Sequence, residues 1–331
     1  MSQFLSNCSI GALAVAAQAL QDGSLVAFPT ETVYGLGADA TNSRAVARIY
    51  EVKGRPTDHP LIVHIAELKY LERWISDIPE YAIALARKFW PGPMTLILRR
   101  SELAKDFITG GQDTVGIRVP ANSLALALLE AFHKLGGLGI AAPSANRFGQ
   151  VSPTTAEAVQ EELDNYLSDT DLVLDGGQSS VGLESTIIDC TGALPRILRP
   201  GAITIAMIED VTELKVSNSS DKKSGDCNEE SIRVSGSLEN HYAPKAKVFL
   251  DQLPVDGSGL IALDFINTPD GVIRLAAPES VEEFARVLYS ALREGDHQKL
   301  DSIYIDQPTG DGLAIAIRDR LSRAAKGGQF E

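Results

Sequence analysis

Apolar positions along the first 208 residues follow two periods, which is typical of an α/β protein. Helical spacing, with apolar residues three or four positions apart, predicts helices at 9–21, 43–50, 79–90, 123–135 and 154–167. Short apolar or β-branched runs predict strands at 25–29, 61–65, 95–98, 115–119, 139–142, 172–174 and 186–189. Because strands and helices alternate, we expect an α/β domain with a mixed sheet over residues 1–208.

The pattern changes after residue 208 and restarts near residue 246. Residues 217–228 are rich in serine, lysine and aspartate and offer little to bury, so 209–245 is predicted to be a flexible linker. The following strands are expected at 248–250, 259–265, 272–275 and 302–305, with helices at 280–293 and 312–325. This predicts a small α/β, Rossmann-like domain over 246–331. It has neither GxGxxG nor a Walker A sequence, so its fold alone implies no ligand.

Composition narrows the functional class. The chain has 331 residues, 44% of them hydrophobic, which fits a globular protein of two domains. A net charge of -14 and a pI of about 4.9 argue against stable nucleic-acid binding over a broad face. The three cysteines are far apart and form no CxxC, and no apolar run is long enough to span a bilayer. We therefore expect a cytoplasmic protein without a membrane segment.

The segment 53–64 concentrates charge that could bind an anion. It carries two permanent cations, Lys53 and Arg55, and two histidines, His59 and His64. Two prolines predict a loop up to residue 59, which places the cations where a strand begins. Cations on a stiff loop suit a nucleotide phosphate, although a solvated basic loop is the alternative. The histidine spacing is poor for a metal, so no zinc site is predicted.

Four other polar loops follow or precede predicted strands, at 29–37, 114–120, 143–154, and 182–186 with 199–201. Hydroxyls and glycines at strand ends fit ligand contact in α/β sheets, and small hydroxyls at a helix start suit phosphate oxygens. Turns with satisfied hydroxyls and plain helix capping are the alternatives.

Arg118 lies inside an apolar strand, where an arginine is costly unless it is paired. It is expected to face a pocket that holds a carboxylate, with an internal salt bridge as the alternative. The sequence contains no HExxH motif, no cysteine nucleophile with a partner and no visible Ser-His-Asp arrangement. This inventory favours chemistry by positioning and charge neutralisation, as in nucleotidyl or phosphoryl transfer.

Together these loops resemble the threonylcarbamoyl-AMP synthase family, whose catalytic domain has the YrdC-like fold. The resemblance runs through residues 5–208, in the segments FPTETVYGLG (28–37), KGRPTDHPLIVHI (53–65), PGPMTLIL (91–98), VGIRVP (115–120), PSANRFGQVSPT (143–154), GLESTIID (182–189) and ILRPG (197–201). HYAP (241–244) matches the motif that joins the extra C-terminal domain of longer members. His59 and Phe148 depart from the asparagine and the small residue expected there.

The resemblance implies a concave cationic pocket and a reaction. L-threonine, bicarbonate or carbon dioxide, and ATP would give threonylcarbamoyl-AMP and pyrophosphate, with Mg²⁺ carried by the ATP. A downstream tRNA threonylcarbamoyl transferase complex would then modify adenosine 37 of tRNAs reading ANN codons.

It also implies roles for particular residues. Threonine would be bound by Thr32, His64, Arg118, Ala142 and Ser185. ATP would be bound by Lys53, Arg55, His59, Thr114, Ser144, Asn146, Ser152, Arg199 and His241. Lys53 and Arg55 would act as the catalytic cations, and 209–245 is expected to act as a lid. No metal-binding residues are expected.

Two other functions compete with this hypothesis. One is a non-catalytic, RNA-binding YrdC-like module. The other is carbamoyl transfer, as in hydrogenase-maturation proteins that contain a related domain. Those proteins also carry zinc-finger and acylphosphatase-like segments, which this sequence does not show.

Overall fold

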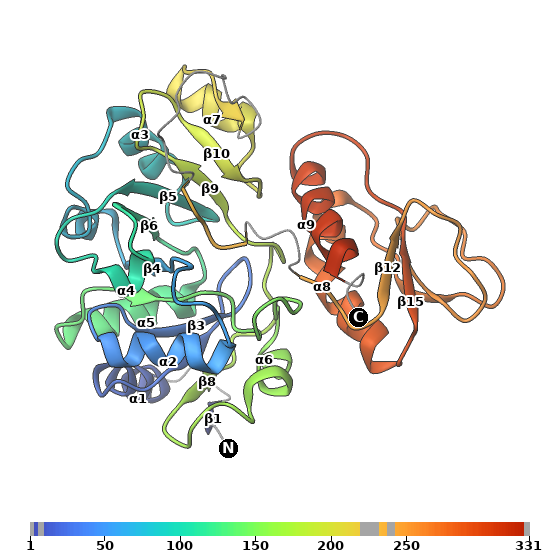
Figure 1. The fold of residues 1–331 in the computed structure, drawn as a ribbon, viewed down its shortest axis with the longest axis horizontal. Coiled ribbons are helices and arrows are strands. Elements are labelled where there is room, and N and C mark those ends of the chain that lie inside the picture. The colour runs from blue at the N-terminus through green and yellow to red at the C-terminus, as the bar shows by residue number, and fades with distance from the viewer. Residues whose placement is uncertain (1–2, 6–9, 219–231, 237–241, 328–331) are drawn as a thin grey trace.

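The chain folds into a large N-terminal body and a small C-terminal one (Figure 1). The structure is a computed structural model and describes residues 3–5, 10–218, 232–236 and 242–327. In Figure 1 the large body runs from blue to yellow, and the small body is orange and red. Two helices of the small body, α8 (Val281–His297) and α9 (Leu313–Gly327), face the large one.

A mixed sheet forms the centre of the large body, as the alternating pattern predicted. Its strands are β1 (Gln3–Leu5), β2 (Val26–Phe28), β3 (Gly35–Asp39), β4 (Ile62–His64), β5 (Met94–Arg99), β6 (Thr114–Arg118), β7 (Ile140–Ala141), β8 (Leu172–Leu174), β9 (Thr186–Asp189), β10 (Arg196–Arg199) and β11 (Ser217–Asn218). Over the described ranges the order is β1-β8-β2-β3-β7-β4-β6-β5-β9-β10-β11. Strand β4 runs parallel to β6 and antiparallel to β7.

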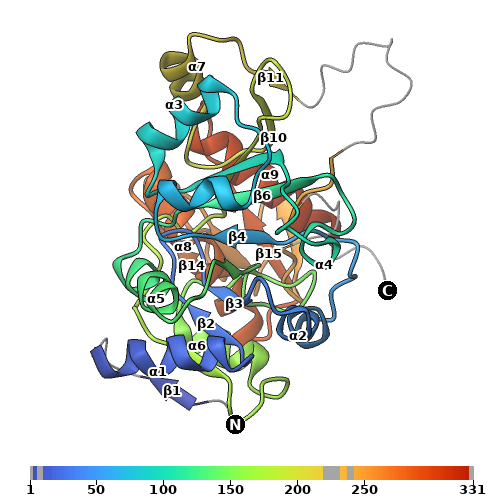
Figure 2. The ribbon, with the colours of Figure 1, turned by 90° about the vertical axis from the view of Figure 1, so that its left-hand side faces the viewer.

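Helices pack on this sheet and bury its apolar side chains. They are α1 (Ile10–Gln21), α2 (Ser43–Lys53), the 3₁₀ helix η1 (Leu68–Arg73), α3 (Glu80–Phe89), α4 (Asp106–Thr109), α5 (Ser123–Lys134), α6 (Ala156–Leu163) and α7 (Ile205–Thr212). Helix α1 packs against α5, and α3 against α7. Figure 2 views the large body from the side away from the C-terminal body, whose orange and red ribbon lies behind the sheet.

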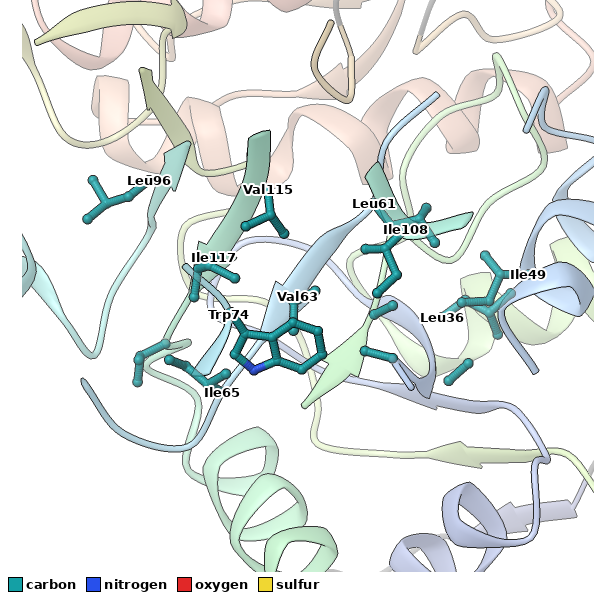
Figure 3. Packing of buried hydrophobic residues seen from close by; sticks show 14 of the residues in the cluster. Leu36, Ile49, Leu61, Val63, Ile65, Trp74, Leu96, Ile108, Val115 and Ile117 are labelled. Carbon is teal, nitrogen blue, oxygen red and sulfur yellow. The ribbon is translucent and has the colours of Figure 1, made fainter. Parts of the chain in front are cut away.

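The main apolar core lies against the central strands. Figure 3 shows the Trp74 ring beside Val63, Ile65 and Ile117, which come from β4, the residue after it, and β6. The Trp74 side chain is fully buried, and the aromatic ring supplies a large apolar surface to this core. The core therefore fixes the strands whose ends carry the polar loops.

The small body has its own sheet of four parallel strands. They are β12 (Lys247–Leu250), β13 (Gly259–Ile261), β14 (Ile273–Ala276) and β15 (Ser302–Ile305), in the order β12-β15-β13-β14. A parallel sheet with helices matches the small α/β domain that the sequence predicted. None of the helices in the described residues combines the length and the hydrophobicity that a membrane crossing requires.

Several predicted element boundaries were wrong. Helix α2 extends to Lys53, which was expected in a loop, because Gly54 ends the helix in a left-handed conformation at φ 61°. The N-cap of α2 is Asn42, and that of α6 is Thr155, one residue after the predicted start of that helix. In each case the neighbouring polar side chain accepts the hydrogen bonds of the first turn.

Seven elements of the described residues were not predicted at all, namely β1, β3, η1, α4, β10, α7 and β11. The glycine-rich stretch that becomes β3 was taken as a loop, yet it pairs antiparallel with both β2 and β7. Strand β10 and helix α7 fall where no element was expected, and α7 crosses the predicted domain end at residue 208. Ala38 of β3 pairs with Ala141 of β7, and a partner so far along the chain is not revealed by a local pattern.

Candidate functional site

A small polar cavity lies at the ends of the central strands. Its wall contains every residue expected to bind threonine, namely Thr32, His64, Arg118, Ala142 and Ser185. Ser144 and Arg199, from the expected nucleotide set, line it too. The topology explains this gathering, because β3, β7, β4 and β6 are neighbours and His64 is the register partner of Arg118.

Arg118 forms a buried ion pair inside the cavity wall. Its Nη2 atom donates to Glu31 Oε1 at 2.6 Å, and the other Glu31 oxygen accepts from the Ala121 N–H at 2.9 Å. The side chains of Arg118 and Glu31 are 5% and 8% exposed. Both expectations for Arg118 therefore describe part of the geometry, since it is paired internally and also faces the cavity.

His64 presents a neutral imidazole to the cavity. Burial, and then the positive charge of Arg118, lower the pKa of His64 to about 3. The ring meets Phe28 edge-on at 5.9 Å between centroids. Its buried Nδ1 atom has no hydrogen-bond partner among the described residues. A neutral ring nitrogen without a partner can pair with a polar group of a ligand.

Lys53 lies behind the loop that carries the small hydroxyls. The side chain is buried, which excludes the alternative of a solvated basic loop at this position. Its Nζ donates to the carbonyl oxygens of Ser144, at 2.7 Å, and Asn146. Burial, followed by repulsion from Arg55, holds the pKa of Lys53 well below its ordinary value. A bound anion would raise that pKa again and favour the charged ammonium.

Arg55 and the two residues that depart from the family pattern form one cluster. The Arg55 guanidinium lies 5.9 Å from the centre of the Phe148 ring, which His59 meets edge-on at 5.5 Å. Arg55 Nη2 donates to the Pro60 carbonyl at 3.0 Å, and burial lowers the pKa of Arg55 to about 10. His59 and Phe148 therefore lie against each other, and Phe148 also lies beside the Arg55 guanidinium.

The other residues expected to bind ATP do not all lie at the cavity. Asn146 and Ser152 are fully buried close to the cavity, and the Asn146 Oδ1 atom lacks a partner in the described parts of the chain. Thr114 lines a separate small hollow, next to Ile62 and Ser235. His241 lies outside the described residues.

Residues beyond the sheet close the cavity. Arg199 Nη1 donates to the Ser235 carbonyl at 2.9 Å, and both Ser235 and Tyr242 line the wall. Gly236 has φ 79°, and a side chain there would place Cβ 2.2 Å from the Tyr242 hydroxyl. The cavity that remains has a volume of about 40 Å³. This is room for about three water-sized probes and far less than ATP needs.

The sequence reasoning missed Glu184 and Tyr242, which line the cavity, and Glu31, which pairs with the wall residue Arg118. Each lies within a motif that the sequence had singled out, and a charged residue between apolar or small neighbours was the available signal for the two glutamates. Both carboxylates are fully engaged by donors, so neither offers a metal ligand as it stands. Across the described residues, no cluster of three metal-ligating side chains occurs.

Sequence models of two families match the chain. One, described as "Telomere recombination", matches residues 18–201. The other, described as "Threonylcarbamoyl-AMP synthase, C-terminal domain", matches residues 203–326.

Curated relatives and solved structures resemble the chain along nearly its full length. The threonylcarbamoyl-AMP synthase of Pyrococcus abyssi is 41% identical, over 94% of this chain and 93% of its own. That of Bacillus subtilis is 40% identical, over 95% of this chain and 93% of its own. The crystal structure of P. abyssi Sua5 complexed with L-threonine has a TM-score of 0.86 at 38% identity, covering 99% of this chain and 98% of the other. The chain therefore belongs to the threonylcarbamoyl-AMP synthase family.

Proposed function

We propose that the protein is a nucleotidyltransferase that forms threonylcarbamoyl-AMP and pyrophosphate from L-threonine, bicarbonate or carbon dioxide, and ATP. The observation that carries this proposal is a set of buried, uncompensated cations. Lys53, Arg55 and Arg199 are at most 6% exposed, and none forms an ion pair with a carboxylate of the described residues. Buried cations without counter-charges are costly unless an anion such as a triphosphate binds.

The threonine carboxylate is assigned to Arg118. The Nε atom of Arg118 is buried and has no partner within the described ranges, so one donor is left for a ligand. Glu31 holds the guanidinium in place, which lowers the entropy lost on binding. Thr32, Ser185 and the neutral His64 imidazole offer further polar contacts on the same wall. The crystal structure of the Pyrococcus abyssi relative complexed with L-threonine supports threonine as the ligand.

The triphosphate is assigned to the cations. A carbamate is a weak, short-lived nucleophile, so the site must hold it in line with the α-phosphorus and exclude water. Lys53 and Arg55 would offset the charge that builds on the leaving pyrophosphate. Mg²⁺ would enter with the nucleotide, held by phosphate oxygens and water, because the carboxylates of the wall are already bound to arginine.

The product is assigned to tRNA modification. A downstream tRNA threonylcarbamoyl transferase complex would use it to modify adenosine 37 of tRNAs reading ANN codons, in the cytoplasm. The mixed anhydride of the intermediate hydrolyses readily, so it must be consumed soon after release.

Residues 209–245 are proposed to act as a lid over the cavity. Ser235 and Tyr242, which belong to this segment, already form part of the wall. Because the cavity of about 40 Å³ is too small for ATP, part of its wall must move before the nucleotide enters.

Pyrophosphate release tests the reaction itself. Purified protein with ATP, Mg²⁺ and bicarbonate is assayed with each of the twenty amino acids in turn. We expect release only when threonine and bicarbonate are both present. Release with a different amino acid would revise the pocket, and salt-sensitive tRNA binding without any release would favour the RNA-binding alternative.

Replacing Arg118 tests the threonine site. Arg118→Ala should raise the threonine dissociation constant by about 10- to 100-fold, since a charge-assisted bond to the carboxylate is lost. ATP affinity should stay within about twofold, because the other cations are kept. Calorimetric titration of each ligand measures both. Arg196→Ala on β10, which breaks the ion pair with Asp189 of β9, is the matched control. Equal weakening of both ligands by Arg118→Ala would contradict the role.

Limited trypsin digestion tests the lid. Arg233 lies in the proposed lid with a side chain 45% exposed, whereas Lys69, in η1 and outside the lid, is 60% exposed. ATP and threonine together should change the cleavage rate at Arg233 and leave the rate at Lys69 unchanged. Mass spectrometry of a time course follows both sites. An unchanged rate at Arg233 with both ligands bound would exclude the lid.

The neutral state of His64 predicts a pH dependence of stability. Its pKa is about 3 in the folded protein against an ordinary value of 6.5, so the unfolded chain binds more protons between these pH values. The free energy of unfolding should therefore fall as the pH drops from 6.5 towards 3. His64→Gln should make this fall shallower, as measured by urea unfolding without ligands over a series of pH values. Parallel pH curves for the two proteins would rule out the neutral state.

A further inference from the structure

The C-terminal body reaches the cavity wall through two polar side chains. Arg320, on α9 and 1% exposed, donates from Nε to Glu184 Oε2 at 2.9 Å and from Nη2 to the Pro200 carbonyl at 2.9 Å. The Tyr289 hydroxyl, on α8, donates to the same Glu184 oxygen at 2.9 Å. One carboxylate oxygen of the cavity wall is thus held entirely by the other body.

The second oxygen of Glu184 fixes a residue assigned to ATP. Glu184 Oε1 accepts from the Ser152 hydroxyl at 2.7 Å. Although burial raises the pKa of Glu184, Arg320 and then Arg199 lower it to about 2, so the carboxylate is ionised. An ionised carboxylate only accepts, so Ser152 must be the donor. The Ser152 oxygen is then left as an acceptor, which suits a nucleotide hydroxyl or amino group.

Apolar packing between the two bodies keeps Glu184 close to Arg320 and Tyr289. Val33, Val151 and Leu183, from three motif loops of the large body, share one buried cluster with Phe284 and Leu288 of α8. At Gly182 an added Cβ would lie 2.5 Å from the Ala285 carbonyl oxygen, so the loop before Glu184 rests directly on α8. The contact between the bodies therefore includes the backbone of the site.

The position of Glu184 also matters for Arg199. Both are buried and attract each other, but they form no ion pair with each other in the described residues. Without Arg320, the nearest positive charge for the buried carboxylate would be Arg199. A direct pair between them would neutralise a cation assigned to the triphosphate.

We propose that Arg320 and Tyr289 are positioning residues of the nucleotide site, which hold Glu184 away from Arg199 and, through it, orient the Ser152 hydroxyl. The C-terminal body thereby completes a site formed otherwise by the large body. This role rests on the proposed function, because it takes Ser152 and Arg199 as ATP contacts. The alternative is that Arg320 and Tyr289 only hold the two bodies together, and the test must distinguish this structural role from positioning.

The test compares Tyr289→Phe and Arg320→Met in the full chain with Arg318→Met. Tyr289→Phe removes one hydroxyl and keeps the ring that stacks on Tyr242. Arg318, also on α9, donates to the carbonyls of Pro308 and Gly310 and serves as the control for losing an arginine of that helix. The readouts are the thermal midpoint, and kcat and KM for ATP and for threonine in pyrophosphate release.

A positioning role predicts a selective effect on ATP. Tyr289→Phe should raise KM for ATP about tenfold and Arg320→Met about 100-fold, with KM for threonine changed less than about threefold. Arg318→Met should match the wild type. In a Glu184→Gln background, Tyr289→Phe should add little, because both changes act on one interaction.

Lower thermal midpoints with an unchanged KM for ATP would overturn the proposal and leave only the structural role. If Arg320→Met does not fold, Tyr289→Phe decides the question alone. Wild-type protein that releases no pyrophosphate would sink the proposed function itself. In that event, ATP affinities measured by calorimetry on the same variants still decide the positioning role.

Discussion

The cost of holding several cations away from water governs how this site is built. Arg118 and Arg320 each have a carboxylate partner within hydrogen-bond distance. Lys53, Arg55 and Arg199 have backbone carbonyls instead. Carbonyl dipoles satisfy hydrogen bonds without cancelling charge, so the positive potential stays available to a ligand. An acidic protein can thus keep a local basic interior.

Division of the cations into paired and unpaired groups matches the proposed chemistry. A paired arginine such as Arg118 is rigid and suits a small carboxylate that must be oriented. Unpaired cations suit a triphosphate, whose charge grows on the leaving group during the reaction. Under the proposed function, Arg118 orients a small zwitterion, and Lys53, Arg55 and Arg199 stabilise a polyanion.

Local patterns in the sequence predicted the strands and loops that carry the residues assigned to threonine, because those residues lie at strand ends beside strong apolar runs. They did not predict that Lys53 is helical. Two prolines further along the chain indicated a loop, but the helix continues to Gly54, which ends it. The sequence did not predict Arg320 and Tyr289 as site residues for another reason. Helices α8 and α9 look like ordinary amphipathic helices, and the partner Glu184 lies more than 100 residues away.

The apolar cluster that Val33, Val151 and Leu183 share with α8 has a consequence for how the molecule comes apart. Separation of the two bodies would expose these side chains to water and leave Glu184 without two of its donors. Both penalties fall on the same event, so they favour a single cooperative melting transition over independent loss of the smaller body. A shortened chain that ends before α8 would consequently expose the apolar side chains of this cluster and the Glu184 carboxylate at the surface of the site. Such a chain would tend to self-associate.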